Sequence, residues 1–544
     1  MRHAHPCMKQ AAAGSVRAAT YWSLIVIVLL GLRLPALVEP AGNDQSLYMY
    51  VADQVRHGGV PYVDAWDQKP PAIFFLYAAV RSVWPHQSAV AIADLIGAGL
   101  IAALLFVIGR RTIGGHGGGL AAAVFALFSH PSFARLSGVY VRGQCEVFIA
   151  LAVTAAMVLT WRRDQRAIHL ALAGLALGVA FWLKYNALAY AVPLFFALAL
   201  GFDDQRRASM SLVARVTWVV GGVVAVSGVV LLYFAGHGAL EALKLATIDY
   251  NLRYSSETYT AGAAGALRYI VGLPVERGGA DMLWFLGLAG AACLTLVGWA
   301  RHRALTIVVL GWLAASGLSI LVNGARNLPQ YFVQAAPALA LSAAAGLILM
   351  WRTGRLGQSV AVLIVVAGLW RVGVDAPIGG LRWGALPQLA DNIAFDVSYL
   401  RGRIDRAAYL SRFKGAQKYD AAAVADLSAY LAHTTQDSDR ILVFGFAPAV
   451  YLESHRLSAS RFFWSRPVIL EFAADHAGYG SSGLLADLKR QQPSVIALQK
   501  QDWGPGDPNS EAFFLGHVDL HAWLSAGYSL ERDTPIFSVW RRKS

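Results

Sequence analysis

The sequence has few charged residues and very few cysteines, and both shortages exclude classes of protein. Only 15% of its 544 residues are charged, whereas about a quarter is usual in soluble globular chains, so a wholly soluble protein is excluded. Cys7, Cys145 and Cys293 lie far apart and have the spacing of neither metal ligands nor a disulfide framework. The net charge of +13 is spread in small groups, so we expect no nucleic-acid partner.

The sequence contains long apolar runs. Hydrophobic residues make up 56% of the chain, and about 18 or more consecutive apolar residues predict a membrane-spanning helix. We therefore expect a polytopic α-helical membrane protein with about eleven spans. The expected spans are 21–38, 87–109, 117–134, 145–161, 167–183, 187–201, 212–235, a run ending before Arg301, 304–322, a run ending on Arg352 and Arg355, and 357–374.

Basic residues set the expected orientation of these spans. Short connections that carry arginine, among them Arg110, Arg162 and Arg206, alternate with longer connections that hold most of the acidic residues. Because cytoplasmic loops are rich in Lys and Arg, we expect a cytoplasmic N-terminus and extracytoplasmic loops at 39–86 and 236–281. The first run could also be a secretory signal peptide, but its length and the lack of a clean cleavage site favour an uncleaved span.

The last part of the chain differs in kind from the apolar runs. Residues 441–445 and 494–498 are short apolar segments typical of strands, and helical patterns cover 417–433 and 483–491. Strands alternating with helices predict a small α/β domain, in which residues 536–540 would form an edge strand. We therefore divide the chain into a transmembrane domain, 1–375, and an extracytoplasmic α/β domain, 376–544.

The first outer loop carries the residues best suited to chemistry. Asp44 follows the end of a span, where a carboxylate could act as a general base on an acceptor hydroxyl. Lys69 precedes two prolines and an apolar run, so it could offer its charge to a lipid phosphate. Tyr62 and Trp66 could stack on a sugar or anchor the loop at the interface. The alternative is that these acidic and aromatic residues simply populate an interfacial loop.

Two further features allow different interpretations. Asp94 lies inside the second expected span, where an ionisable residue either lines a functional cavity or ties two helices together. The segment 478–483 formally matches the glycine pattern of dinucleotide-binding loops. It follows no clear strand, so we do not expect it to bind a nucleotide.

Several short motifs, taken in order, resemble one known family. They are Asp44 after the first span, Gly59-Val-Pro-Tyr62, Lys69-Pro-Pro71, Arg142-Gly-Gln-Cys-Glu-Val-Phe148, Leu183-Lys-Tyr-Asn186, Gly324-Ala-Arg-Asn-Leu-Pro-Gln-Tyr-Phe332 and Arg440-Ile-Leu-Val-Phe-Gly445. This series resembles the bacterial dolichyl-phosphate-mannose-protein mannosyltransferase-like family, which includes the lipid A aminoarabinose transferases and belongs to the GT-C glycosyltransferases. The resemblance implies a GT-C-like helical bundle in the bacterial inner membrane and a polyprenyl-phosphate-linked sugar as donor.

The resemblance also implies roles for individual residues. Asp44 would be the catalytic base that deprotonates the acceptor, and Glu146 would orient the acceptor or the donor sugar across the cavity. The donor phosphate would be bound by Lys69, Arg326, Lys184 and Arg142. Substrate contacts are expected at Tyr62, Asp67, Asp94, Gln330 and Tyr331. The expected reaction is a single inverting transfer of the sugar to a hydroxyl of a lipid, a glycan or a protein.

Two positions depart from the family pattern. Gln45 stands where the family often has a second acidic residue, and Gln330 stands where it usually has histidine. The missing carboxylate makes a divalent metal less expected, and no cofactor is firmly implied. A lipid-linked-sugar flippase or a non-catalytic envelope scaffold is the alternative function. The lack of internal repeats argues against a transporter.

Overall fold

The computed structural model describes residues 5–129, 137–201, 210–256, 262–323, 328–373, 386–415, 419–500, 502–503 and 508–543. By its internal contacts the chain forms two compact units. The first unit comprises Met1–Leu37, Ala91–Val230 and Ser255–Val397, and the second comprises Val38–Val90, Leu231–Tyr254 and Ser398–Ser544. The predicted division into residues 1–375 and 376–544 stays a prediction.

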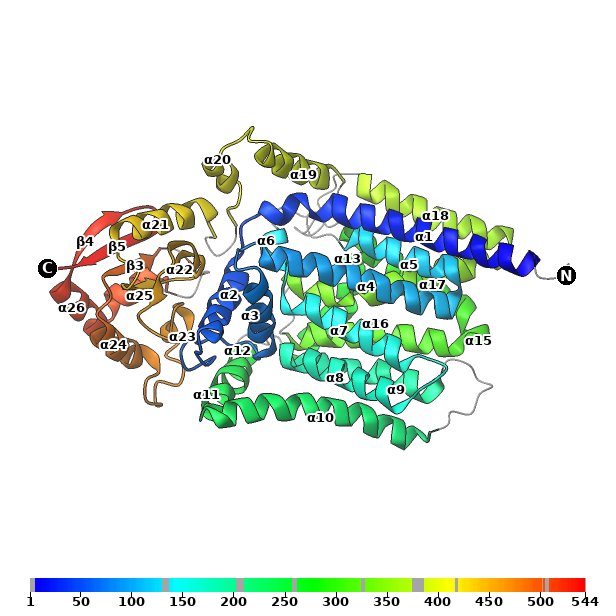
Figure 1. Ribbon diagram of the computed structural model, residues 1–544, viewed down its shortest axis with the longest axis horizontal. Helices are drawn as coiled ribbons and strands as arrows, with labels where there is room; N and C mark the ends of the chain where they lie inside the picture. The colour runs from blue at the N-terminus through cyan, green and yellow to red at the C-terminus, as the bar shows by residue number, and fades with distance from the viewer. Residues whose placement is uncertain are drawn as a thin grey trace. The chain divides into compact units, whose positions relative to one another are not determined.

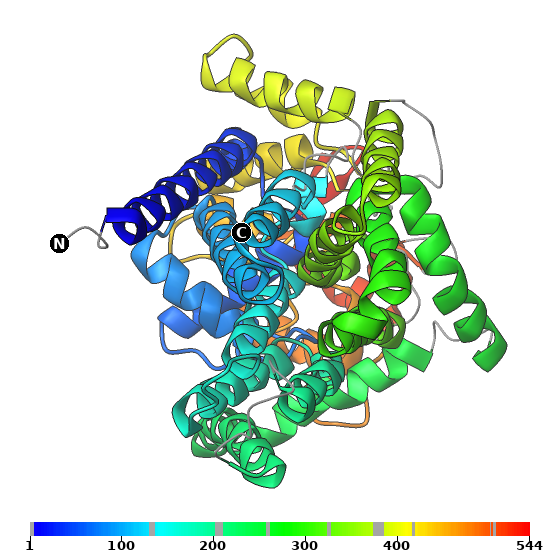
Figure 2. The same ribbon diagram turned by 90° about the vertical axis from the view of Figure 1, so that its right-hand side faces the viewer.

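The first unit is helical in the part that the structure describes, and most of its helices run side by side (Figure 1), as the turned view along them also shows (Figure 2). Its elements are α1 (His5–Arg33), most of α4 (Ala89–Ile113), α5 (Gly115–Phe128), α6 (Ser137–Val141), α7 (Cys145–Thr160), α8 (Ala167–Leu183), η3 (Tyr185–Tyr190), α9 (Ala191–Leu200), most of α10 (Leu212–Gly236), α13 (Gly262–Ala280), α14 (Met282–Cys293), η5 (Leu294–Gly298), α15 (Trp299–Arg301), α16 (Arg303–Val322), η6 (Pro329–Ala335), α17 (Ala336–Trp351), α18 (Arg355–Gly373) and most of α19 (Leu386–Leu400).

Apolar helices confirm the expectation of a multi-pass membrane protein. Among the described residues, five helices are long and apolar enough to cross a membrane: Ala19–Val38, Ala89–Ile113, Leu212–Gly236, Arg303–Val322 and Pro329–Trp351. The pair Ala264–Gly279 and Met282–Gly298 would add a sixth, bent by 114°. Other predicted spans coincide with shorter apolar helices such as α7 and α8, so the count of about eleven spans stays a prediction.

Small residues allow two of these helices to pack closely. A Cβ atom added to Gly290 on α14 would lie 2.2 Å from the carbonyl oxygen of Ser342 on α17, and one on Gly346 would lie 2.2 Å from the carbonyl oxygen of Gly290. The Ser342 hydroxyl also donates to the Gly287 carbonyl at 2.8 Å. Close backbone approach and interhelical hydrogen bonds are how helices associate in lipid, where the hydrophobic effect does not drive them together.

The second unit contains the first predicted outer loop and the beginning of the second, up to Tyr254, and both segments are largely helical. The first forms α2 (Asn43–Arg56) and α3 (Ala72–Val83), and the second begins with α11 (Leu240–Lys244), the π-helical turn η4 (Leu245–Asp249) and α12 (Tyr250–Ser256). The C-terminal part of this unit adds α20 (Arg406–Ser411), α21 (Ala421–Thr434), α22 (Ala449–Ser454), α23 (Arg466–Ile469), α24 (Gly480–Gln491), α25 (Ser510–Gly516) and α26 (Val518–Gly527).

A five-stranded sheet confirms the predicted α/β character of the C-terminal part. Its strands are β1 (Arg440–Phe444), β2 (Leu457–Ser458), β3 (Val495–Gln499), β4 (Tyr528–Asp533) and β5 (Phe537–Arg542). The order is β2-β1-β3-β5-β4, with β1 parallel to β2 and β3, and β5 antiparallel to β3 and β4. The prediction of an edge strand at 536–540 was therefore wrong. β5 lies inside the sheet because the less apolar β4 covers its outer side.

Residues of the first outer segment are bound to the C-terminal part within this unit. The Tyr50 hydroxyl accepts from the Ser458 amide at 2.9 Å, and the Tyr50 ring packs on Tyr451 and Phe463. The Tyr419 hydroxyl donates to the Ala41 carbonyl at 2.9 Å. The sheet domain therefore holds the segment on which Asp44 and Lys69 lie.

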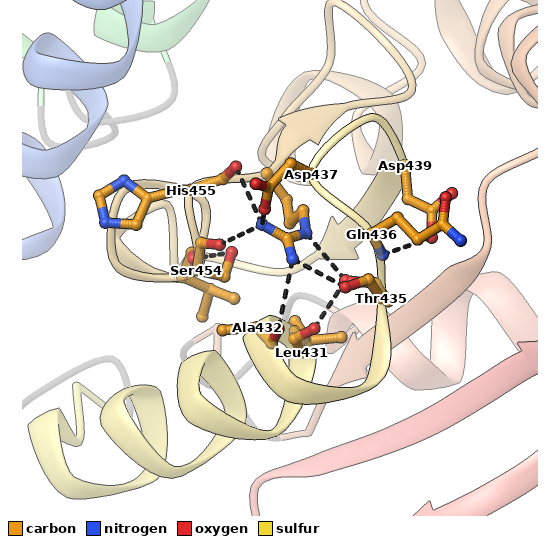
Figure 3. A network of polar contacts seen from close by, with 10 residues as sticks. Leu431, Ala432, Thr435, Gln436, Asp437, Asp439, Ser454 and His455 are labelled. Atoms are coloured by element: carbon orange, nitrogen blue, oxygen red, sulfur yellow. Dashed lines mark hydrogen bonds and ion pairs between the residues drawn. The ribbon is translucent and has the colours of Figure 1, made fainter.

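A buried arginine fastens the end of α21 to the chain after α22 (Figure 3). The Arg456 guanidinium donates to the side-chain and backbone oxygens of Thr435 at 2.9 and 2.8 Å and to the Ser454 carbonyl at 2.9 Å. It also pairs with Asp437 at 2.8 Å, although the Asp437 side chain is 98% exposed. Carbonyl groups that the helix end leaves unpaired are thus satisfied by one side chain.

Candidate functional site

Asp44 lies in the first turn of α2, and the local sequence explains how this helix begins. Gly42 is the N-cap residue, and its amide donates to the Gln45 side-chain oxygen at 2.7 Å. Gln45 therefore caps the helix, a task that a glutamate side chain performs equally well. The half-buried Asp44 carboxylate lies at the positive end of the helix dipole, where a negatively charged side chain stabilises the helix.

The loop before α3 fixes the backbone around Lys69. Tyr62 adopts a left-handed conformation, with φ of 71°, and its hydroxyl donates to the Lys69 carbonyl at 2.7 Å. The Asn251 side chain donates to the Gln68 carbonyl at 2.7 Å. Two carbonyls in succession are therefore held by side chains, and the Lys69 side chain is half-buried. Strained backbone of this kind is kept where the surroundings over-determine it.

Asp67 interacts electrostatically with both Asp44 and Lys69. Its side chain is buried, and burial raises its pKa from 3.8 to about 7; the charge of Lys69 and the Gln68 amide act in the opposite direction, and the charge of Asp44 raises it further. Asp67 Oδ1 accepts from the Gln68 amide at 2.6 Å. Within the described part of the chain, Oδ2 is buried and has no hydrogen-bond partner. Asp44, Asp67 and Lys69 thus form one charged cluster in the second unit.

The two aromatic residues predicted near this cluster are core residues. Tyr62 and Trp66 are 0% exposed. The Trp66 ring packs among Tyr250, Trp464 and Phe472, and its carbonyl accepts from the Trp464 indole nitrogen at 3.0 Å. Trp66 therefore anchors the loop inside the protein, whereas the expected anchoring at the membrane interface stays a prediction. A contact of Tyr62 with substrate stays a prediction.

The first unit holds a buried ion pair between two of the predicted residues. Lys184 Nζ, just after α8, lies 2.5 Å from Glu146 Oε1 in the first turn of α7. The ammonium group also donates to Asn323 Oδ1 at 3.2 Å and lies 4.3 Å from the centre of the Tyr331 ring. Lys184 therefore neutralises Glu146. Its predicted role in binding the donor phosphate remains a prediction, as does the role of Glu146 in orienting substrate.

Asp94 forms a second buried pair in the same unit. The Arg33 guanidinium at the end of α1 lies 2.6 Å from Asp94 Oδ2, and Asp94 Oδ1 accepts from the Gly143 amide at 3.1 Å. The neighbouring Arg142 donates to the Ala36 carbonyl at 2.9 Å. Asp94 therefore ties together α1, α4 and the segment before α7, as one of its two interpretations expected.

A mostly apolar pocket within the first unit has this ion pair in its wall. Arg33, Asp94 and Asp281 are its charged lining residues. Aliphatic and aromatic side chains line the rest: Ala98, Ile101, Phe125, Phe128, Val141, Val147, Ala150, Leu283, Trp284, Phe332, Val333 and Ala336, with Ser129. Asp94 therefore also lines a cavity, whereas its expected contact with substrate stays a prediction. A pocket of this composition suits an apolar chain with a polar end.

Arg277 is a buried cation that sequence reasoning missed. Its guanidinium lies 3.3 Å from the centre of the Phe332 ring. Two of its nitrogens, Nε and Nη2, are buried without a hydrogen-bond partner among the described residues. Arg277 belongs to no sequence motif, so it is recognised as a candidate only because the structure shows that its side chain is buried. Of the residues predicted in the late motif, Tyr331 is buried and the preceding Gln330 is half-buried. Arg326 lies outside the described residues.

Comparison with known proteins gives the fold. No protein-family model and no curated protein matches the sequence. The structure of ArnT from Cupriavidus metallidurans bound to undecaprenyl phosphate is similar over 98% of this chain and 98% of that chain, with 14% identity and a TM-score of 0.54. The Archaeoglobus fulgidus oligosaccharyltransferase in the apo form is 11% identical over 89% of this chain and 69% of that chain, with a TM-score of 0.49. The likeness to ArnT spans both chains, so the GT-C fold predicted from the motifs is confirmed.

Proposed function

We propose that this chain is a membrane glycosyltransferase that moves a sugar from a polyprenyl-phosphate donor to a hydroxyl group at the extracytoplasmic face. The single observation that carries the proposal is the charged cluster of Asp44, Asp67 and Lys69 in a chain of GT-C fold. The ArnT structure of the same fold holds undecaprenyl phosphate, a lipid phosphate of the proposed donor class. A base and a fixed cation are what such a transfer requires.

The proposed step needs one base and one phosphate-binding cation. Asp44 takes the proton of the acceptor hydroxyl, whose oxygen then attacks the anomeric carbon of the sugar. The bond between that carbon and the phosphate oxygen breaks, and its electron pair leaves with the polyprenyl phosphate. Lys69 stabilises the negative charge that develops on this leaving group. A single displacement inverts the anomeric carbon.

Asp67 suits a positioning role in this step. Its pKa of about 7 means that it carries a proton for much of the time near neutral pH. A protonated Asp67 leaves Asp44 as the ionised member of the two carboxyls, because two nearby carboxylates resist simultaneous ionisation. A neutral Asp67 also does not compete with a phosphate for the Lys69 charge.

The first unit, taken by itself, has a feature that fits an apolar lipid. Its pocket beside Arg33 and Asp94 suits part of a polyprenyl chain. Glu146 and Lys184 hold α7 and α8 together, so in this proposal Glu146 orients substrate only while Lys184 balances its charge. The acceptor could be a lipid, a glycan or a protein.

Lipid analysis of the purified chain tests the donor class. We expect mass spectrometry to find a polyprenyl phosphate or its sugar adduct on wild type, and to find it depleted in Lys69→Ala. Lys414→Ala is the matched control, because Lys414 is an exposed lysine of the same unit whose charge is balanced by Asp420 at 3.2 Å. Equal amounts of polyprenyl phosphate on all three proteins would remove Lys69 from the phosphate site.

A turnover assay separates catalysis from transport. Asp44→Asn should keep the co-purified lipid and lose sugar transfer to an acceptor in detergent, where no membrane separates two compartments. Movement of a lipid-linked sugar across proteoliposomes by this variant at the wild-type rate would instead favour the flippase alternative.

A further inference from the structure

A second pocket lies at the ends of two apolar helices in the first unit and is distinct from the site described above. Arg110 and Arg111 come from the last turn of α4, and Arg162, Arg163 and Asp164 follow the end of α7. Phe106 and Val107, one turn earlier on α4, form its apolar wall. Residues about 50 positions apart in sequence thus surround one hollow.

The lining carries a strong excess of positive charge. Four arginines face one aspartate, which gives a net charge of 4 − 1 = +3. Asp164 pairs with Arg162 at 3.1 Å and with Arg166, which is outside the lining, at 3.6 Å. Among the residues that the structure describes, the lining of the pocket therefore has more arginines than carboxylates. An anion would lower the mutual repulsion of these guanidinium groups.

Backbone contacts hold part of this cluster in place before any ligand arrives. Arg111 Nη1 donates to the Val158 carbonyl near the end of α7 at 2.8 Å. This bond joins α4 to α7 and holds one guanidinium of the lining in place. Arg110 and Arg163 are exposed, so solvent reaches both side chains. One held cation and two exposed cations therefore line the pocket together with apolar side chains.

We propose that this pocket binds the phosphodiester headgroup of an anionic phospholipid. Guanidinium groups bind phosphate through paired hydrogen bonds, and basic pockets between membrane helices suit anionic headgroups. Phe106 and Val107 offer an apolar surface to the glycerol and the first acyl carbons, which free phosphate lacks. The predicted orientation places this end of α4 and α7 at the cytoplasmic leaflet.

Native mass spectrometry of the full chain in mild detergent tests the pocket. Wild type should retain phosphatidylglycerol at least tenfold more tightly than phosphatidylcholine with the same acyl chains. Arg110→Gln/Arg163→Gln should lose this preference while keeping the wild-type thermal midpoint, because the contact of Arg111 with Val158 remains. Arg303→Gln/Arg355→Gln is the matched control, since it removes the same charge from two exposed helix-end arginines that do not line the pocket.

The outcomes decide between the possible anions. Unchanged phosphatidylglycerol retention in Arg110→Gln/Arg163→Gln, or an equal loss in the control pair, would overturn the proposal. Inorganic phosphate at millimolar concentration serves as the competing probe. Retention of phosphatidylglycerol in its presence supports a lipid site, whereas full displacement would show that the pocket takes a free phosphate group and would overturn the lipid assignment.

Discussion

Lys184 Nζ lies 2.5 Å from Glu146 Oε1, and both side chains are almost completely buried, at 9% and 1% residue exposure. A buried pair of this kind resists the loss of either partner, because the remaining charge has no compensation. The loss of both charges together is much better tolerated. The Glu146–Lys184 pair therefore allows structure and catalysis to be separated by a double-mutant cycle.

Lys184→Met and Glu146→Gln should each destabilise the protein by about 3–5 kcal/mol. The double variant should recover most of this loss, because no unpaired charge remains. Thermal midpoints in detergent measure the effect. If the double variant recovers the midpoint and also recovers transfer activity, Glu146 has no role in orienting substrate.

Asp44→Asn should lower the rate of sugar transfer by about 100-fold or more, the usual scale for a positioned general base. Asp44→Glu should retain part of the rate, because it keeps a carboxylate at the start of α2. Gln45→Glu, at the neighbouring position, is the matched control. Its side chain can still accept from the Gly42 amide, so its rate should stay near wild type. A wild-type rate in Asp44→Asn would remove the base assignment.

Asp67 should make stability depend on pH. Its pKa is raised from 3.8 to about 7 in the folded protein, so the folded state binds the proton more tightly than the unfolded chain. The stabilisation is present in full below about pH 4 and is lost as the pH rises through about 7. The thermal midpoint of wild type should therefore fall between pH 5 and pH 8 more than that of Asp67→Asn.

The exposed Asp437 provides the control for this pH dependence. Between pH 5 and pH 8, the midpoint of Asp437→Asn should fall by as much as that of wild type. If the midpoint of Asp67→Asn falls as much as that of wild type between pH 5 and pH 8, a group other than Asp67 causes the pH dependence. The charges of Asp44 and Lys69 interact with Asp67. The pH dependence of the transfer rate should therefore differ between Asp67→Asn and wild type.

Arg456→Met should destabilise the C-terminal part by about 2–3 kcal/mol, because the Thr435 and Ser454 carbonyls lose a charged donor. Asp437→Asn removes only the exposed partner of Arg456 and should cost less than about 1 kcal/mol. Limited proteolysis and thermal midpoints measure both changes. Equal effects of the two substitutions would contradict the importance of the buried carbonyl contacts.

Local patterns in the sequence predict most helices and strands but not their partners. The apolar segments at 441–445 and 494–498 form β1 and β3, and the runs at 145–161 and 167–183 coincide with α7 and α8. The pattern of β5 suggests an edge strand because no further apolar segment follows it. Its neighbour β4 escapes prediction, because Tyr528 is the one buried residue of that strand and a strand with so few apolar residues has no clear alternation.

Only those residues of the candidate site that belong to a sequence motif could be predicted. Motif order places Asp44 and Lys69 in one segment and predicts Asp67 only as a substrate contact. The structure shows that Asp67 is a buried carboxyl on which both charges act. The pairing of Glu146 with Lys184 joins residues 38 positions apart and depends on how α7 and α8 pack, which no local pattern specifies. Arg277 has no motif around it and is recognised only by its burial.

The make-up of the second unit has a consequence for biosynthesis. Trp66 is packed by Trp464 and Phe472, and the hydrogen bond between Trp66 and Trp464 joins residues 398 positions apart. A chain made from its N-terminus exposes this tryptophan while the intervening helices are inserted. The segment with Asp44 and Lys69 therefore gains its final partners only when the last quarter of the chain emerges. A truncated product would have its apolar helices, but the candidate site would lack the contacts that hold it.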